Sequence, residues 1–199
     1  MAHALQAIEK GSSSFAAASR LFDERTREST LMLYAWCRHC DDVIDGQVLG
    51  HGQREGSRED SVRSLRMLEH ETRQACAGRP SDEPAFICLS EVMKRHDIGV
   101  ELPLAHLAGF RMDVENVRYE SLPDTLLYCY RVAGVVGLMM ARIMGARDDA
   151  VLDRACDLGI AFQLTNIARD IVDDAAIGRV YVPEQWLRSR GIPIDEIED

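Results

Sequence analysis

Two stretches of the chain place acidic residues in a line along an otherwise apolar helix. In a helix, Tyr34, Arg38, Asp41 and Asp45 are spaced by four, three and four residues, so they fall on one stripe. Most of the remaining circumference is apolar, as in a buried helix, and consists of Leu31, Met32, Leu33, Ala35, Trp36, Val43 and Ile44. Like charges at this spacing repel by about 0.2–0.5 kcal/mol even in water, and burying them unpaired costs far more. The pattern therefore predicts that something positive lies against the stripe.

The same design returns about 120 residues later. Gln163, Asn166, Asp170 and Asp174 again share one helical stripe among apolar neighbours. One such stripe can be an accident, but two are harder to dismiss. If the two helices are antiparallel or steeply crossed neighbours that face one cavity, four carboxylates and an amide oxygen converge there. Hard oxygen ligands suit Mg²⁺, so the pattern predicts divalent cations that grip a diphosphate and stabilise it as a leaving group.

Other readings of these acidic motifs fit less well. A solvated acidic face is usually broad and mixed in charge, whereas these stripes are narrow and flanked by apolar residues. A calcium loop beginning at Asp41 would need oxygen ligands where the chain has Val43 and Gly52. A di-iron bundle needs Glu-x-x-His pairs, which the sequence lacks. Cys37 and Cys40 form a lone CxxC without a second pair for zinc, so the six cysteines are predicted to be free thiols.

Composition narrows the class of protein. The 199 residues suffice for one domain, and 46% hydrophobic with 28% charged residues is typical of a globular chain. A net charge of -10 argues against nucleic-acid binding. The first twenty residues contain Glu9, Lys10 and Arg20 and do not match a signal peptide. The longest apolar stretch, Val132–Ala141, is much shorter than the roughly 20 residues of a membrane span, so a cytoplasmic location is expected.

Apolar residues recur at helical spacing between turn signals, without the alternation of strands. We expect helices near residues 13–20, 25–45, 59–76, 84–96, 103–117, 122–145, 148–176 and 183–190. Ser121 and Pro123 are typical of a helix start, with a capping hydroxyl and a proline in the first turn. The prediction is a single all-α domain over residues 1–199.

Three longer motifs carry a resemblance to the squalene/phytoene synthase family of head-to-head prenyltransferases, and within it to bacterial phytoene synthases. They are YAWCRHCDDVID at 34–45, YCYRVAGVVGLMM at 128–140 and LGIAFQLTNIARDIVDDAAIGRVYVP at 158–183. The resemblance runs from about Lys10 to Pro183. It implies an all-α fold of the type I isoprenoid synthase kind, a helical bundle around a central cavity.

The resemblance also implies roles for individual residues. The catalytic and metal-binding set would be Asp41, Asp45, Asn166, Asp170 and Asp174, with Asp42 as a helper and Arg38 and Tyr34 beside them. The substrate contacts would be Gly11, Ser12, Ser13 and Ser14 in an N-terminal turn, Tyr34, Arg38, Gln163, Asn166 and Arg169 near the diphosphates, Tyr128 on the cavity wall, and Arg179 and Tyr181 on a flap.

The implied reaction joins two geranylgeranyl diphosphate molecules into phytoene through a cyclopropyl (prephytoene) diphosphate, in carotenoid biosynthesis. It would use Mg²⁺ or Mn²⁺ and no NADPH. One alternative is a squalene or dehydrosqualene synthase type of enzyme that uses farnesyl diphosphate. Another is a non-catalytic helical assembly protein of the same family. The small residues of 132–137 fit two interpretations equally: an apolar wall for prenyl chains, or close helix packing through Gly134 and Gly137.

Family members usually continue past the Arg-x-Tyr-x-Pro motif, so we expect this chain to lack the C-terminal helices. The segments Val132–Ile143 and Gly159–Val172 would then expose apolar faces. Prenyl diphosphates are the expected small-molecule partners. A peripheral membrane association for the lipophilic product, and contacts with downstream carotenoid enzymes, stay open.

Overall fold

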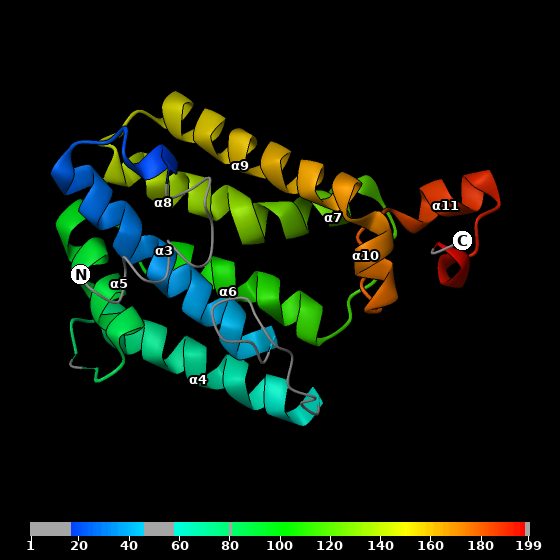
Figure 1. The fold of residues 1–199 in the computed structure, drawn as a ribbon, viewed down its shortest axis with the longest axis horizontal. Helices are drawn as coiled ribbons and strands as arrows, with labels where there is room; N and C mark the ends of the chain where they lie inside the picture. Colours follow the sequence, from blue (N-terminus) through cyan, green and yellow to red (C-terminus); the bar gives the residue numbers. More distant parts are fainter. Residues whose placement is uncertain (1–16, 46–57, 80, 198–199) are drawn as a thin grey trace.

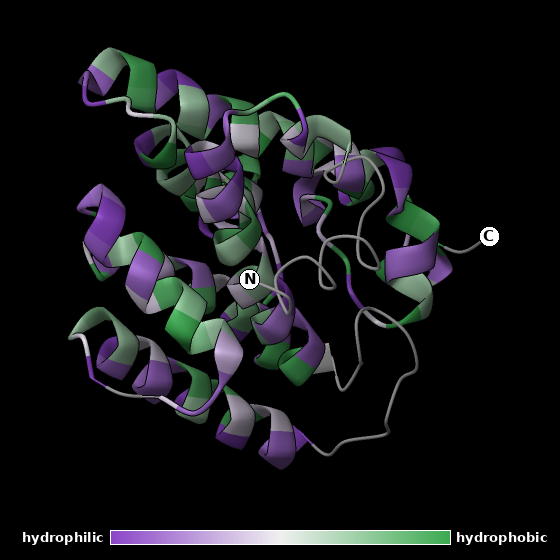
Figure 2. Cartoon of the chain, turned by 60° about the vertical axis from the view of Figure 1, so that its left-hand side comes forward, coloured by the Kyte–Doolittle hydropathy of each residue, from purple (hydrophilic) through white to green (hydrophobic). Residues whose placement is uncertain are grey.

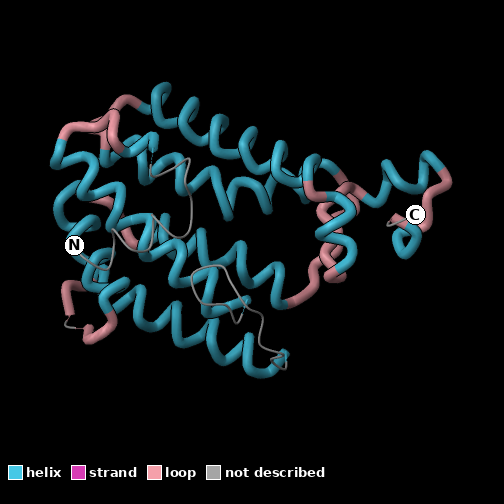
Figure 3. Tube along the Cα trace, in the orientation of Figure 1, coloured by secondary structure: helices cyan, strands magenta, loops and turns pink. Residues whose placement is uncertain are grey.

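The computed structural model describes residues 17–45, 58–79 and 81–197, and this part of the chain consists of helices and loops without a strand (Figure 3). The predicted N-terminal helix lies only partly inside these ranges, where residues 17–19 are helical. The predicted diphosphate turn of Gly11, Ser12, Ser13 and Ser14 lies outside them.

The helices follow the sequence prediction closely (Figure 1). They are α3 (Glu24–Asp45), α4 (Arg58–Cys76), α5 (Pro84–His96), α6 (Glu101–Val114), α7 (Leu122–Cys129), α8 (Val135–Ile143), α9 (Asp149–Arg169), α10 (Ile171–Ala176) and α11 (Glu184–Arg190), with a π-helical turn at Tyr130–Gly134 and a 3₁₀ turn at Ile194–Glu196.

Local side chains explain where several helices begin. Before α3, the Asp23 carboxylate accepts hydrogen bonds from the Arg25 and Thr26 N–H groups. In the first turn of α7, Asp124 Oδ2 accepts from both the N–H and the hydroxyl of the preceding Ser121, at 2.8 and 2.7 Å. Before α9, Asp148 Oδ1 accepts from the Val151 N–H at 3.1 Å. These contacts satisfy backbone or side-chain donors at the helix entrances, and they confirm the predicted start at Ser121.

The main core lies among α3, α4, α5, α6 and α8. Trp36, Leu68, Leu89, Leu107 and Met139 are fully buried in it, one from each helix. Figure 2 shows hydrophobic and hydrophilic residues on the same helices, as expected where one face packs inward and the other meets water. A smaller cluster, built around three tyrosines, lies where α6, α7, α9 and the segment after α10 meet. The six cysteines are free thiols, as predicted.

Glycines bring α9 against the π turn and α8. A Cβ added to Gly159 would lie 2.5 Å from the Ala133 carbonyl oxygen, and one added to Gly137 would overlap the Ala155 carbonyl oxygen. A Cβ on Gly134 would lie 3.1 Å from the Cys156 sulfur. This geometry confirms the close-packing interpretation for Gly134 and Gly137. A cavity wall formed by other residues of 132–137 stays a prediction.

Two expected helices are interrupted. The helix expected over 122–145 contains the π turn, and the helix expected over 148–176 breaks at Asp170, whose φ of -105° and ψ of 17° are not helical. The sequence showed neither feature because the apolar spacing continues through both. Functional sites are common at π turns and at residues in this bridge region of backbone space.

The antiparallel arrangement expected for the motif helices is wrong, while the steeply crossed alternative stays a prediction. In Figure 1, α3 and α9 both run from the left side of the bundle to the right, so they are not antiparallel neighbours. Instead, α9 packs on α7, α8 and the π turn, while α3 packs on α4, α5, α6 and α8. Because α8 contacts both, it joins the two motif helices.

The helix α9 and the start of α10 carry exposed apolar side chains. Leu158 and Phe162 are 56% and 63% exposed, and Val172 in α10 is 53% exposed. Phe162 and Val172 match the predicted exposed flank of 159–172, and Leu158 lies directly before it. The other predicted exposed segment, 132–143, does not fit, because each of its residues is buried or half-buried. One stretch, Leu122–Ile143, is long and apolar enough to cross a membrane. It packs against α6 and α9, as the core helix of a bundle does.

Candidate functional site

In the first motif, a positive charge comes from the same helix. Arg38 pairs through Nη1 with Asp41 Oδ2 at 2.9 Å and through Nε with Asp42 Oδ1 at 3.1 Å. Sequence spacing of three and four residues makes these pairs accessible within one helix. The predicted need for a positive partner is therefore met at least in part by Arg38 itself, and a cation at Asp41 would share that carboxylate with it.

Tyr34 lies one turn before Arg38 and is half-buried. Burial raises the pKa of its phenol, the Arg38 charge opposes this, and Asp41 and Asp42 add to the rise. The hydroxyl therefore stays protonated at neutral pH and can act as a hydrogen-bond donor. Asp45 is the last residue of α3, and its side chain lies outside the described part of the structure.

The second motif spans the junction of α9 and α10. The Asp170 N–H donates to the Asn166 carbonyl at 2.9 Å, and the Asp174 N–H donates to the Asp170 carbonyl at 2.8 Å. The four-residue register of the predicted stripe thus persists through the break. The Asn166 side-chain amide donates to Gln163 Oε1 at 3.4 Å, so these two polar residues are also adjacent.

Arg169 pairs with an aspartate of its own motif, as Arg38 does in the first. Its guanidinium binds Asp170 in a bidentate manner, with Nε to Oδ1 at 2.6 Å and Nη2 to Oδ2 at 2.5 Å. This hydrogen bonding lowers the pKa of the Asp170 carboxyl. At Asp174, burial and the nearby Asp170 charge raise the carboxyl pKa, and Arg179 opposes them. The motif therefore holds two carboxylates and two arginines in one electrostatic unit.

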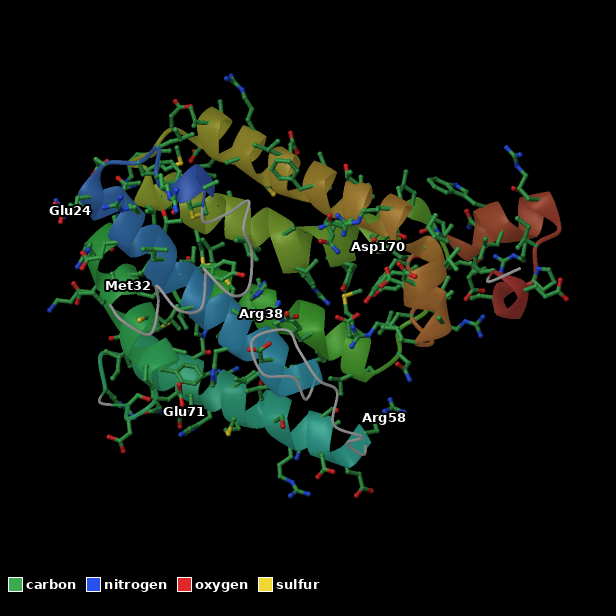
Figure 4. All side chains as sticks on the ribbon, in the orientation of Figure 1. Glu24, Met32, Arg38, Arg58, Glu71 and Asp170 are labelled. Atoms are coloured by element: carbon green, nitrogen blue, oxygen red, sulfur yellow. The ribbon has the colours of Figure 1, made fainter. Side chains whose placement is uncertain are left out.

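Within residues 17–45, 58–79 and 81–197, no three His, Cys, Asp or Glu side chains come close enough to form a metal-binding group. Apart from Asp45, whose side chain is not described, the structure brings together members of each motif, and the described side chains do not join the two motifs into one cluster. Figure 4 shows Arg38 on α3 and Asp170 at the start of α10, on different elements of the bundle. The donors that are described, carboxylate and amide oxygens, are of the type that Mg²⁺ prefers.

A third group of polar residues was missed by sequence reasoning. Asp113, near the end of α6, accepts hydrogen bonds from the hydroxyls of Tyr128 and Tyr181, at 3.2 and 2.8 Å. Both tyrosines are nearly buried, and burial raises the pKa of each, with a further rise from the Asp113 charge. One signal was available, namely an aspartate between the apolar residues Met112 and Val114.

Tyr128 and Tyr181 therefore point their hydroxyls at Asp113 in this structure. A cavity of about 350 Å³ lies beside them, lined in part by Asp113, Arg179 and Tyr181. The predicted substrate contacts of Tyr128, Arg179 and Tyr181 stay predictions. A second cavity of about 450 Å³ lies between α3 and α5 and is lined by residues of neither acidic motif.

Known proteins with a similar sequence and fold show to which family this all-helical bundle with two Arg–Asp motifs belongs. Residues 8–199 match the sequence profile of the squalene/phytoene synthase family. The chain therefore belongs to this family, which confirms the resemblance found in its motifs.

Two bacterial relatives are similar over nearly the whole chain. The 15-cis-phytoene synthase of Pantoea ananas is 60% identical over 190 residues, which cover 96% of this chain and 62% of the relative. The 15-cis-phytoene synthase of Enterobacter agglomerans is 58% identical over 192 residues, 96% of this chain and 65% of the relative. The chain thus spans somewhat less than two thirds of the length of these curated relatives.

Solved structures confirm the predicted fold. A dehydrosqualene synthase in complex with ligand superposes with a TM-score of 0.86 at 30% identity, covering 100% of this chain and 66% of the other. The squalene synthase HpnC from Alicyclobacillus acidocaldarius gives a TM-score of 0.83 at 27% identity, covering 98% of this chain and 70% of the other. The chain has the helical fold of isoprenoid synthases.

Proposed function

We propose that the chain is the motif-bearing part of a phytoene synthase, which condenses two geranylgeranyl diphosphate molecules head to head in carotenoid biosynthesis. The observation that carries the proposal is the 60% identity to a 15-cis-phytoene synthase over 190 residues. Two Arg–Asp motifs with carboxylates at helical spacing support it, because the reaction must neutralise and expel a diphosphate.

The residue types in each motif indicate which side chains would bind the cations. Asp41 and Asp45 on one side, and Asn166, Asp170 and Asp174 on the other, would hold Mg²⁺ or Mn²⁺, with Asp42 as a helper. The bound cations would supply charge neutralisation for the leaving diphosphate.

The arginines have the complementary role. Arg38 and Arg169 each pair with a carboxylate of their own motif. With a cation held at that carboxylate, the guanidinium would be available to a phosphate oxygen, which it could bind in a bidentate manner. Tyr34 and Gln163 lie along the same stripes and can donate hydrogen bonds to the same anion. Each arginine thus serves as a counter-ion before substrate binding and as a phosphate ligand afterwards.

The hydrocarbon step needs an apolar site that excludes water. An allylic cation formed by loss of one diphosphate is attacked by the double bond of the second molecule, which gives the cyclopropyl diphosphate. A second ionisation, rearrangement and proton loss give phytoene. The apolar residues of 132–140 would shield the cations from water.

The use of farnesyl diphosphate is the second candidate, because a dehydrosqualene synthase is a close structural neighbour. The much higher identity to phytoene synthases favours the longer substrate. A non-catalytic assembly role is disfavoured by the retention of Asp41, Asp45, Asp170 and Asp174. We further propose a cytoplasmic location, with peripheral contact to the membrane that receives the product.

A chimera tests the proposal. Residues 8–199 replace the matching part of the Pantoea ananas relative, and the purified protein is incubated with geranylgeranyl or farnesyl diphosphate, with and without Mg²⁺. The expected result is phytoene from the first substrate, only when the metal is present. A C30 hydrocarbon as the sole product would favour the farnesyl alternative. A folded chimera that makes neither would contradict catalysis by this chain.

A further inference from the structure

Asp113 connects two tyrosines that are distant in the sequence. Tyr181 donates to Oδ1 at 2.8 Å and Tyr128 to Oδ2 at 3.2 Å, so each carboxylate oxygen receives one phenol. The two rings stack with centroids 4.5 Å apart and an interplanar angle of 22°. Their exposed fractions are only 5% for Tyr128 and 7% for Tyr181. One carboxylate on α6 therefore fixes a side chain of α7 and a side chain of the segment that follows α10.

The backbone around Tyr181 is fastened as well. Its carbonyl accepts a hydrogen bond from the buried Thr125 hydroxyl at 2.8 Å. Three residues later, the Glu184 N–H donates to the Tyr119 carbonyl at 2.8 Å. The Arg118 guanidinium also pairs with the Glu184 carboxylate at 2.5 Å. The segment 179–185 is thus attached to the loop before α7 and to α7 itself.

This segment is directly continuous with the second acidic motif. The Arg179 N–H donates to the Asp174 carbonyl at 2.9 Å and closes the end of α10. Tyr181 follows only two residues later, with Gly178 at a positive φ of 77° just before Arg179. The Tyr181 anchor is therefore joined to Asp174 through two residues of backbone and one backbone hydrogen bond.

We propose that Asp113 is a positioning residue for the second acidic motif. Its carboxylate holds Tyr128 and Tyr181 and thereby sets where Arg179 and the end of α10 lie relative to α6. Both phenol hydroxyls donate to Asp113 in this arrangement. The anchoring of Tyr128 and Tyr181 by Asp113 does not depend on the proposed function. Only its consequence for diphosphate binding rests on that function.

Tyr119 offers a matched control within the same cluster. It is 2% exposed and packs against both other tyrosines, with ring centroids 5.6 Å from Tyr128 and 5.7 Å from Tyr181. Within the described ranges its hydroxyl has no hydrogen-bond partner. Removing that hydroxyl changes the ring cluster as Tyr181→Phe does, but it leaves the Asp113 anchor intact.

Hydrogen exchange read by mass spectrometry tests the anchor in the 199-residue chain. Tyr181→Phe should accelerate exchange of the amides in 179–185 about tenfold or more, because a hydrogen bond to a charged group is lost. Asp113→Leu should do so more strongly, and Asp113→Asn less, since an amide still offers an acceptor and a donor. Tyr119→Phe should leave this segment unchanged, and exchange in α4 should be unchanged in all four variants.

Three outcomes would overturn the anchor. They are unchanged exchange of 179–185 in Tyr181→Phe, equal effects of Tyr181→Phe and Tyr119→Phe, and acceleration that is uniform over α4 and 179–185. If Asp113→Leu fails to fold, Tyr181→Phe alone decides.

A second readout connects the anchor to the proposed site. Mg²⁺-dependent binding of geranylgeranyl diphosphate should weaken in Asp113→Leu, recover in Asp113→Asn and persist in Tyr119→Phe. Equal binding by Asp113→Leu and the unmodified chain would contradict the positioning role. Absence of binding by the unmodified chain would contradict the proposed function, while the exchange result would still decide the anchor.

Discussion

The Tyr181 hydroxyl donates a 2.8 Å hydrogen bond to Asp113 although 68 residues separate the two in the sequence. The bond attaches the segment after α10 to α6, at the edge of the smaller core cluster. It also means that Tyr181, expected on a flap over the phosphates, is 7% exposed in this structure. The segment after α10 is therefore a fastened part of the fold, and its position bears on where Arg179 lies.

Removing a carboxylate from either motif should abolish most activity in the chimera. Asp41→Asn and Asp170→Asn each take a charge from the proposed cation sites, so turnover should fall by about 10²-fold or more, roughly 2.7 kcal/mol of transition-state stabilisation. Product formation at saturating Mg²⁺ measures this. Asp157→Asn, on the exposed side of α9, is the control and should retain full activity. Near-normal turnover in both motif variants would contradict the assignment.

Close packing between α9 and the π turn should make Gly159 sensitive to a single methyl group. In Gly159→Ala the new Cβ would lie 2.5 Å from the Ala133 carbonyl oxygen, and backbone cannot move aside cheaply. We expect a loss of about 1–3 kcal/mol of unfolding free energy, measured by urea denaturation. Gly134→Ala is the comparison, because its nearest contact is a side chain at 3.1 Å. Equal stability of the two variants would show that this interface is looser than described.

The buried His106 should make the fold less stable as pH falls. Burial lowers its pKa from 6.5 to about 4, although a hydrogen bond from Nδ1 to the Arg131 carbonyl opposes the shift. Above pH 6.5 the imidazole is neutral in both states and contributes no pH dependence. Between pH 6.5 and about 4 the unfolded chain binds a proton that the folded chain does not, so the unfolding free energy falls, by roughly 3 kcal/mol in total.

Urea denaturation at pH 7, 6 and 5 tests the role of His106. His106→Gln should flatten the pH dependence in this window, whatever its effect at pH 7. The remaining slope would come from other groups, including His96, whose pKa burial also lowers. An identical slope in His106→Gln and the unmodified chain would show that His106 takes up its proton as readily folded as unfolded.

The outer side of α9 should drive self-association. Val151, Leu158 and Phe162 are 44%, 56% and 63% exposed and fall on one side of the helix, at spacings of seven and four residues. Contiguous exposed apolar surface of this kind promotes association. Analytical ultracentrifugation should show oligomers of the 199-residue chain and a shift toward monomer in Phe162→Glu. Arg154→Glu, on an exposed polar position of the same helix, is the control. A monodisperse monomer without substitution would contradict this expectation.

Local patterns were enough to predict most of the fold. Apolar spacing and turn residues placed α3, α4, α5 and α11 to within one or two residues, because short-range periodicity determines which face of each helix is buried. The π turn and the break at Asp170 were invisible, since a change in hydrogen-bond register leaves the apolar pattern intact. The direction of α3 relative to α9 depends on helices between them, which no single stretch of sequence encodes.

The candidate site was predictable from the sequence only where its contacts are local. Arg38 lies three and four residues before Asp41 and Asp42, so its pairing with them was implicit in the spacing. Asp113 was missed because its partners are 15 and 68 residues away, and only the tertiary fold brings them together.

The proposed function requires the motifs on α3 and at the α9–α10 junction to act together on one diphosphate. Calorimetric titration of the 199-residue chain with an unreactive thio analogue of geranylgeranyl diphosphate tests it most directly. We expect binding that requires Mg²⁺ and that weakens at least about tenfold in Asp41→Asn and in Asp170→Asn alike, since each variant loses a charged partner. Equal affinity without Mg²⁺, or weakening in only one of the two variants, would contradict a shared site.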